Sequence, residues 1–189
     1  MEFERLEIEG PVLVKPSRIG DGRGWFSEVL RLNALTEAVG PVAFVQHNHS
    51  FSQAQGTVRG LHFQSHPKAQ GKLIKCIRGR ILDVAVDIRN SSKSFGRHIS
   101  KELNAQNGHE LWIPEGFAHG FVTLEENTEV LYFVTDYYSA QHEHGILWND
   151  PDLGINWGIS EEAAILSEKD GNWPTLRNLD ENVPRGRGQ

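Results

Sequence analysis

Cysteine and methionine are almost absent from this chain, and no long apolar run interrupts it. One Cys and one Met occur among its 189 residues. The single Cys76 cannot form an internal disulfide, which fits a reducing compartment. No stretch approaches the ~20 apolar residues that a membrane helix needs, and residues 1–5 carry charges where a secretion signal would begin its apolar core. We therefore expect a cytoplasmic protein.

Basic residues are outnumbered, with 19 Lys and Arg against 25 Asp and Glu and a formal net charge of −6. Nucleic acids and anionic membranes are bound through basic surfaces, so this balance argues against both as partners. The length favours one domain, and no repeat or long linker divides the chain. We expect a single domain over residues 1–183 and a flexible tail over residues 184–189.

Short strand-like segments follow one another up to about residue 135. They are rich in β-branched and aromatic residues and are separated by turn signals every ~8–12 residues. The segments lie at residues 11–14, 25–30, 43–46, 57–63, 72–77, 81–88, 110–113, 120–123 and 130–134. This rhythm is typical of an antiparallel sandwich or barrel and not of a parallel sheet with crossover helices.

Local patterns add detail to this prediction. The glycine-rich residues 20–24 predict a turn, so a hairpin should join residues 11–14 to residues 25–30. In residues 81–88 apolar and polar side chains alternate, which predicts one buried face. Residues 31–39 show the spacing of a helix.

Nine histidines supply candidate chemistry, because imidazole is the side chain whose ordinary pKa lies nearest neutrality. One hypothesis is a metal site. His47 and His49 would share one face of a strand, and His62 or His119 would complete a three-histidine set with an open position.

The other hypothesis is acid–base chemistry without a metal. In a regular strand Arg59 and His62 point to opposite faces, but a bulge at Gly60 would bring them to one pocket. Together with Lys72 they would form a cationic pocket. Such a pocket could stabilise an enolate while His62 takes a proton, and it would also suit a diphosphate. The sequence alone leaves both hypotheses open.

Eight motifs then occur in order along the chain. They are DGRGWF at residues 21–26, RGLHFQ at 59–64, AQGKL at 69–73, DVAVDIR at 83–89, LWIPEGFAHGF at 111–121, TDYY at 135–138, WNDP at 148–151 and LSEKD at 166–170. Together they resemble the dTDP-4-dehydrorhamnose 3,5-epimerase family over about residues 5–175. The resemblance implies an all-β, antiparallel, cupin-like jelly roll with a few short peripheral helices.

The resemblance also implies an activity. The expected reaction is epimerisation at C3 and C5 of a dTDP-4-keto-6-deoxy-glucose-type sugar nucleotide through an enolate, in dTDP-rhamnose or related deoxysugar biosynthesis. It implies no metal and no cofactor. By the same resemblance His62 is the base, Asp170 holds its ring, Lys72 donates to the oxyanion at C4, and Tyr132 is the acid on the opposite face of the sugar.

Further positions match residues that contact the substrate in the family. They are Gln46, Asn48, Arg59, His119, Tyr138, Glu143 and Lys169, with Tyr138 stacking on the base of the nucleotide. Arg23 and Glu28 also match, and the resemblance implies that they come from the N-terminal hairpin of a partner subunit. We therefore expect a homodimer with exchanged N-terminal strands.

Three positions depart from the family pattern. His47 stands where Asp is common, His144 where Arg is common, and Trp25 where Phe is frequent. The first would place a ring instead of an anion beside the pocket. These departures bear on nucleotide preference and on fine geometry.

Two alternatives to the epimerase are kept. One is a metal-dependent cupin enzyme that uses His47, His49 and His119. The other is a jelly roll that binds a sugar nucleotide without catalysis. It would need only the pocket and its aromatic side chains, and it does not account for the catalytic set implied by the resemblance.

Overall fold

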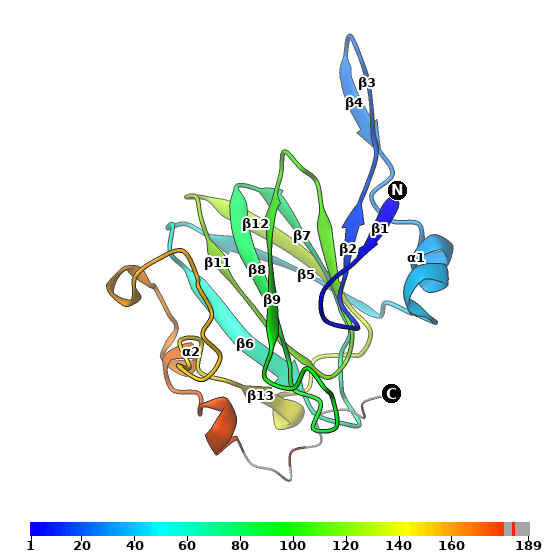
Figure 1. Cartoon of the computed structure of the whole chain (residues 1–189). Coiled ribbons are helices and arrows are strands. Elements are labelled where there is room, and N and C mark those ends of the chain that lie inside the picture. Colours follow the sequence, from blue (N-terminus) through cyan, green and yellow to red (C-terminus); the bar gives the residue numbers. More distant parts are fainter. Residues whose placement is uncertain (180–182, 184–189) are drawn as a thin grey trace.

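The computed structural model describes residues 1–179 and 183, and its strands form two facing antiparallel sheets and a hairpin (Figure 1). The six-stranded sheet runs in the order β1 (Glu2–Arg5), β2 (Val12–Lys15), β10 (Glu110–Ile113), β7 (Lys72–Arg78), β12 (Thr128–Val134) and β5 (Gln46–Ser52). The five-stranded sheet runs in the order β13 (Glu143–Gly145), β6 (Val58–Gln64), β11 (Phe117–Thr123), β8 (Arg80–Asp87) and β9 (His98–Asn104).

The strand order identifies the fold. The eight strands from β5 to β12 divide as 5-12-7-10 in one sheet and 6-11-8-9 in the other. This arrangement is the double-sheet order of a jelly roll. The all-β jelly roll expected from the sequence is therefore confirmed.

Helical segments lie at the edges of the sandwich. They are α1 (Leu32–Val39), α2 (Glu168–Gly171) and three single 3₁₀ turns at Ala140–His142, Glu161–Ala163 and Leu176–Asn178. The predicted helix over residues 31–39 is confirmed as α1, with Arg31 at its N-cap position. The helices of the described residues are too short to span a membrane.

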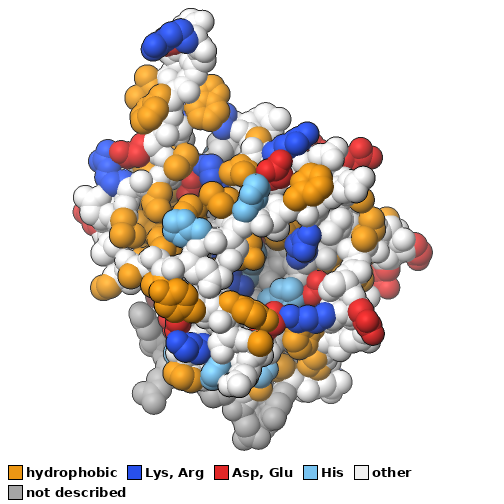
Figure 2. All heavy atoms as spheres, turned by 180° about the vertical axis from the view of Figure 1, so that it is seen from behind, with side chains coloured by type: hydrophobic (Ala, Val, Ile, Leu, Met, Phe, Trp, Pro, Cys, Tyr) orange, Lys and Arg blue, Asp and Glu red, His pale blue; other side chains and the backbone are white. Residues whose placement is uncertain are grey.

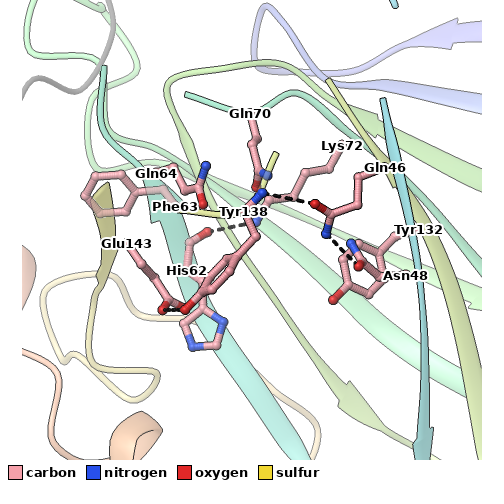
Figure 3. Close-up of a pocket in the computed structure, with 10 residues that line it drawn as sticks. All are labelled: Gln46, Asn48, His62, Phe63, Gln64, Gln70, Lys72, Tyr132, Tyr138 and Glu143. Carbon is pink, nitrogen blue, oxygen red and sulfur yellow. Dashed lines mark hydrogen bonds between the residues drawn. The ribbon is translucent and has the colours of Figure 1, made fainter. Parts of the chain in front are cut away.

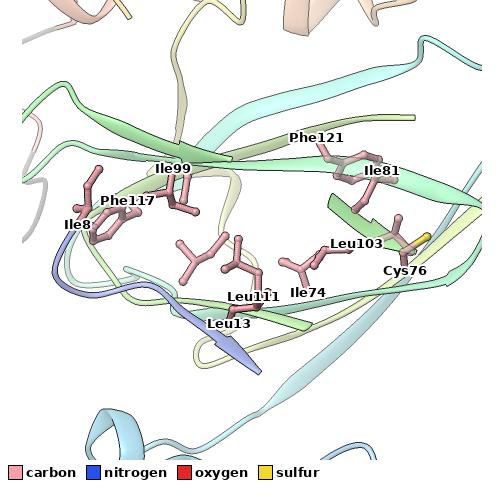
Figure 4. Close-up of a cluster of buried hydrophobic side chains, with 13 residues drawn as sticks. Ile8, Leu13, Ile74, Cys76, Ile81, Ile99, Leu103, Leu111, Phe117 and Phe121 are labelled. Atoms are coloured by element: carbon pink, nitrogen blue, oxygen red, sulfur yellow. The ribbon is translucent and has the colours of Figure 1, made fainter. Parts of the chain in front are cut away.

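Apolar side chains form the core in three layers. The first fills the space between the sheets and includes Ile74, Leu111 and Phe121 (Figure 4). A second cluster covers the outer face of the five-stranded sheet, where the C-terminal segment packs. A third lies on the outer face of the six-stranded sheet, where Leu35 of α1 is fully buried. Both sheets are thus covered on two sides over much of their area.

This layering corrects the prediction of one buried face in β8. Ile81 and Ala85 face the core between the sheets, whereas Leu82 and Val84 pack against the C-terminal segment. Both faces are therefore buried, and the polar residues that alternate with the apolar ones need partners inside the protein. One of them, Asp83, is fully buried and pairs with His119 of β11.

The hairpin also differs from its prediction. The turn over residues 20–24 is present, but it joins β3 (Arg18–Asp21) to β4 (Gly24–Ser27). Residues 12–15 instead form β2 inside the six-stranded sheet, because Val12 and Val14 are buried beside α1. The hairpin projects from the body of the molecule (Figure 1). The expected tail over residues 184–189 lies outside the described residues.

Candidate active site

The site begins at a bulge in β6. His119 of β11 pairs with His62, and Phe121 pairs with Arg59, so β6 carries one residue more than β11 over this stretch. Gly60 lies at the bulge with φ +116°, and a Cβ there would lie 2.6 Å from the carbonyl oxygen of His119. Glycine is thus required by conformation and by space. The bulge brings Arg59 and His62 toward one side of the strand, as the metal-free hypothesis anticipated.

His62 forms a hydrogen bond to a carboxylate far along the chain. Its Nε2 lies 2.5 Å from Oδ1 of Asp170, which belongs to α2. The side chain of Asp170 is 7% exposed, whereas that of His62 is 28% exposed and reaches the pocket. The imidazole is therefore held by Asp170 and still remains accessible from the pocket.

Ser167 fixes the carboxylate of this pair. It is the N-cap residue of α2, and its Oγ accepts a hydrogen bond from the backbone N–H of Asp170 while it donates to Oδ2 of the same residue, 2.9 Å away. Burial raises the pKa of Asp170, but the hydrogen bonds from His62 and Ser167 outweigh burial and leave that pKa below its ordinary value. Asp170 is consequently ionised at neutral pH and can stabilise an imidazolium on His62.

Lys72 enters the pocket from β7. Its side chain is buried, and Nζ donates a hydrogen bond to the carbonyl oxygen of His62 at 3.2 Å. Burial lowers the pKa of Lys72 to about 8, while the negative charges of Asp83 and Glu143 limit the fall. A buried ammonium that still carries its charge at neutral pH can stabilise a developing oxyanion.

Tyr132 reaches the same pocket from the facing sheet. It lies on β12, opposite Asn48 of β5, whereas His62 lies on β6 of the other sheet (Figure 3). Burial raises the pKa of Tyr132, although the positive charge of Arg59 opposes this effect. The phenol therefore keeps its proton at neutral pH. The pocket has a basic imidazole on one wall and a hydroxyl donor on the other.

A second polar cluster lines the pocket beside His62. Glu143 of β13 accepts a hydrogen bond from the Tyr138 hydroxyl at 2.7 Å and forms an ion pair with Nζ of Lys169 at 2.6 Å. Burial raises the pKa of Glu143, but these two partners lower it below its ordinary value. Tyr138 is 55% exposed, so its ring is available at the pocket entrance.

Other predicted residues are held nearby. Gln46 accepts from the backbone N–H of Tyr138 and donates to Oδ1 of Asn48 at 2.8 Å. The guanidinium of Arg59 donates to Ser52 Oγ and to the carbonyl oxygen of Phe51. Gln46 and Asn48 line the pocket, whereas Arg59 lies close enough to Tyr132 for its positive charge to lower the pKa of that phenol.

His119 lies behind the pocket. Its Nε2 is 2.7 Å from Oδ1 of Asp83, and both side chains are buried. Burial lowers the pKa of His119 and raises that of Asp83. Asp83 was not predicted as part of the site. It links His119 to Lys72, because its charge opposes the fall of the Lys72 pKa.

The pocket has a volume of about 310 Å³, at the lower end of the range of small-molecule sites. Figure 2 shows a hollowed face on which basic, acidic and histidine side chains gather. Three lining residues were not predicted individually: Phe63, Gln64 and Gln70. Gln64 accepts from the backbone N–H of Ser139 and donates to the carbonyl oxygen of Tyr137, so it fixes the loop that carries Tyr138. These three residues lie in the motifs at residues 59–64 and 69–73, which were the sequence signal that could have identified them.

The metal hypothesis is wrong in its geometry. Along β5 the side chains of His47 and His49 are exposed, whereas Gln46 and Asn48 between them are partly buried and line the pocket. His47 packs against Phe133, with ring centroids 4.3 Å apart on the outer face of the sheet. The predicted set with His119 therefore does not form. The expectation that His47 lies beside the pocket is wrong for the same reason.

The other departures from the family pattern have different surroundings. His144 stacks on Phe63 with ring centroids 5.4 Å apart, so it contacts a residue that lines the pocket. Trp25 is 60% exposed on β4, with the guanidinium of Arg18 4.0 Å above its ring.

Two predicted residues are not brought to the pocket within this chain. Arg23, in the hairpin turn, pairs with Asp21, and Glu28, which follows the hairpin, pairs with Arg31. The hairpin that carries Arg23 projects from the body (Figure 1), and Glu28 directly follows its second strand, β4.

Comparisons with known proteins place this chain in a family. The family model described as dTDP-4-dehydrorhamnose 3,5-epimerase matches residues 5–178. The chain belongs to this epimerase family. A dTDP-4-dehydrorhamnose 3,5-epimerase of Pseudomonas aeruginosa is 48% identical over 181 residues, which cover 95% of this chain and 98% of the relative. One of Sinorhizobium fredii is 49% identical over 95% of this chain and 91% of the relative.

The solved structures agree with this membership. A dTDP-6-deoxy-D-glucose-3,5-epimerase from Legionella pneumophila, in complex with dTDP-4-keto-L-rhamnose, superposes with a TM-score of 0.93 at 39% identity and covers 99% of each chain. The cupin-like jelly roll and the assignment of the chain as an isomerase, both implied by the motifs, are confirmed.

Proposed function

We propose that this epimerase inverts C3 and C5 of a dTDP-linked 4-keto-6-deoxy sugar, with His62 as the base. The observation that carries the proposal is the His62–Asp170 pair opposite Tyr132 in one pocket. The C4 ketone acidifies the C–H bonds at both neighbouring carbons. One base beside one oxyanion donor can therefore serve both.

Each inversion is a transfer of two protons. Neutral His62 removes the proton from the ring carbon, and its imidazolium is stabilised by ionised Asp170. The electron pair moves into the C4 carbonyl, where the Lys72 ammonium stabilises the enolate oxygen. Tyr132 then donates its proton to the opposite face of the carbon. The catalyst returns to its starting state when His62 loses its proton to solvent and Tyr132 gains one.

Incorporation of solvent deuterium tests this function. Incubation with the dTDP-4-keto-6-deoxy sugar in deuterated water should place label at both C3 and C5, because Tyr132 donates a solvent-derived deuteron at each carbon. Proton NMR and mass spectrometry of the product measure it. Label at one carbon would reduce the activity to a single epimerisation, and no label at either carbon would contradict the function.

The N-terminal hairpin supports a homodimer. Ile19 is 72% exposed and Phe26 is 69% exposed on strands that project away from their own core. Arg23 and Glu28 lie in the same segment, far from the pocket that the family resemblance assigns to them. We propose that this hairpin crosses to a second copy of the chain and supplies both residues to its pocket.

Replacing Ile19 and Phe26 together with Ser should produce a monomer with little activity, because both the apolar contact and the exchanged residues are lost. Sedimentation measures the first effect and turnover the second. The control is Phe95→Ser, which removes another exposed aromatic side chain away from the hairpin. As a stricter test, mixed Arg23→Ala and His62→Ala subunits should recover activity in hybrid dimers. Absence of any recovery would overturn the exchange.

A further inference from the structure

Trp173 lies just after α2, against the back of the His62–Asp170 pair. Its ring centroid is 6.1 Å from that of His62, at an interplanar angle of 70°. Nζ of Lys169 lies 5.5 Å from the centroid of the same indole. The next residue anchors the segment, because the carbonyl oxygen of Pro174 accepts a hydrogen bond from the backbone N–H of Leu147 at 2.8 Å. The indole is thus fixed between α2 and the end of β13.

Gly145 makes room for this indole. It is the last residue of β13 and pairs directly with His62 of β6. A Cβ on Gly145 would lie 2.5 Å from Nε1 of Trp173 and would also overlap Cδ2 and Cε2 of the ring. The φ of Gly145 is not among the left-handed values in this chain, so its conformation is open to other residues. Space for the tryptophan is therefore what requires glycine here.

The indole N–H of Trp173 is buried beside the His62–Asp170 pair. Its Nε1 makes no hydrogen bond within the described residues. Asp170 is the nearby acceptor whose pKa this N–H lowers. Burial raises the pKa of that carboxyl, and donors from His62, Ser167 and Trp173 together bring it below its ordinary value. A buried donor of this kind is costly unless a nearby acceptor uses it.

We propose that Trp173 is a positioning residue of the epimerase: seated on Gly145, its indole holds the ring of His62 and directs its N–H to the Asp170 carboxylate. This inference rests on the proposed roles of His62 and Asp170. Trp173 does not line the pocket, so it acts on the reaction through these two residues. Gly145 and Trp173 depend on each other, because the indole occupies the space that a side chain at position 145 would fill.

The test is the pH dependence of kcat/KM for Trp173→Phe. Phe keeps an aromatic ring over Gly145 but removes the N–H donor. Asp170 then becomes more basic and holds the imidazolium of His62 more tightly, so both effects raise the apparent pKa of the pair. The acidic limb of the profile should move to higher pH by on the order of half a unit, with kcat lowered about tenfold and KM changed little.

The remaining charged or titratable groups around the pair stay in place in this variant. They are Lys72 of β7, His119 of β11, Glu143 of β13 and Lys169 of α2. A shift of the acidic limb on Trp173→Phe therefore reports the lost N–H donor.

Trp157→Phe is the matched control. Its indole Nε1 donates to the carbonyl oxygen of Trp148 at 2.8 Å in the cluster outside the five-stranded sheet. That variant loses a buried N–H donor as well, so its thermal stability should fall while its acidic limb stays in place. An acidic limb of Trp173→Phe that coincides with that of the wild type would overturn the inference.

Gly145→Ala provides a second test that does not depend on the first variant folding. The added methyl group displaces the indole, so kcat should fall and the acidic limb should again move to higher pH. In a Trp173→Ala background the same Gly145→Ala change should cost little further activity, because the clash is gone. Equal effects in both backgrounds would contradict the coupling. If the wild type itself fails to exchange deuterium, the proposed function fails. If the wild type exchanges deuterium and the Trp173 and Gly145 variants behave like it, this inference fails and the proposed function stands.

Discussion

The His62→Ala variant is expected to lose kcat by about 10³-fold, the loss that follows removal of a general base. No other imidazole takes its place, since His119 is buried and hydrogen-bonded to Asp83. Binding of dTDP should stay within a few-fold of wild type, because the substrate contacts expected of Arg59 and Tyr138 are intact. Steady-state turnover and calorimetric titration with dTDP measure the two effects.

The change also leaves Asp170 with fewer donors. A buried carboxylate that loses a hydrogen-bond partner destabilises the protein, so thermal unfolding must show that His62→Ala is folded at the assay temperature. His66→Ala is the matched control, because Nε2 of His66 lies 3.8 Å from Oε2 of Glu115 and His66 does not line the pocket. Turnover of His62→Ala near the wild-type rate would remove His62 from the role of base.

The fold was largely predictable because turn signals and short apolar runs recur along the chain. The sequence could not show which strand or segment each apolar run packs against. The turn at residues 20–24 was predicted correctly. However, β2 pairs with β10 in the six-stranded sheet, because its side chains pack against core residues that lie far away in sequence. Similarly, alternation in β8 shows where side chains point, but it does not show that the C-terminal segment covers the outer face.

The site was predictable to a different degree. Arg59, His62 and Lys72 lie close in sequence, and a bulge at Gly60 was a local hypothesis that the structure confirms. Asp170 is 108 residues from His62, and its local sequence is that of an ordinary helical turn. Only the resemblance to the family pointed to it. Trp173 carried no signal of any kind, since its importance lies in the space that Gly145 leaves.

The Lys72→Met variant is expected to lose about 10²–10³-fold in kcat, the typical loss when one donor to an oxyanion is removed. Met is apolar and similar in length to the buried stem of Lys, so the fold should be kept while the charge is lost. Nζ of Lys72 donates to the carbonyl oxygen of His62, so thermal unfolding is measured for this variant as well. Deuterium exchange should slow in parallel with turnover, because the enolate is common to both.

The pH profile gives the sharper test of Lys72. Its pKa is lowered by burial to about 8, so the ammonium is present below that pH and lost above it. Since only the charged form stabilises the oxyanion, kcat of the wild type should fall as the pH rises through about 8. In Lys72→Arg the guanidinium stays protonated throughout the range, so this limb should disappear even though the bulkier side chain lowers kcat. The Tyr132 phenol titrates at higher pH, because burial raises its pKa, and it cannot mimic the effect. A limb near pH 8 that persists in Lys72→Arg would assign the titration to another group and would contradict the role of Lys72 in stabilising the oxyanion.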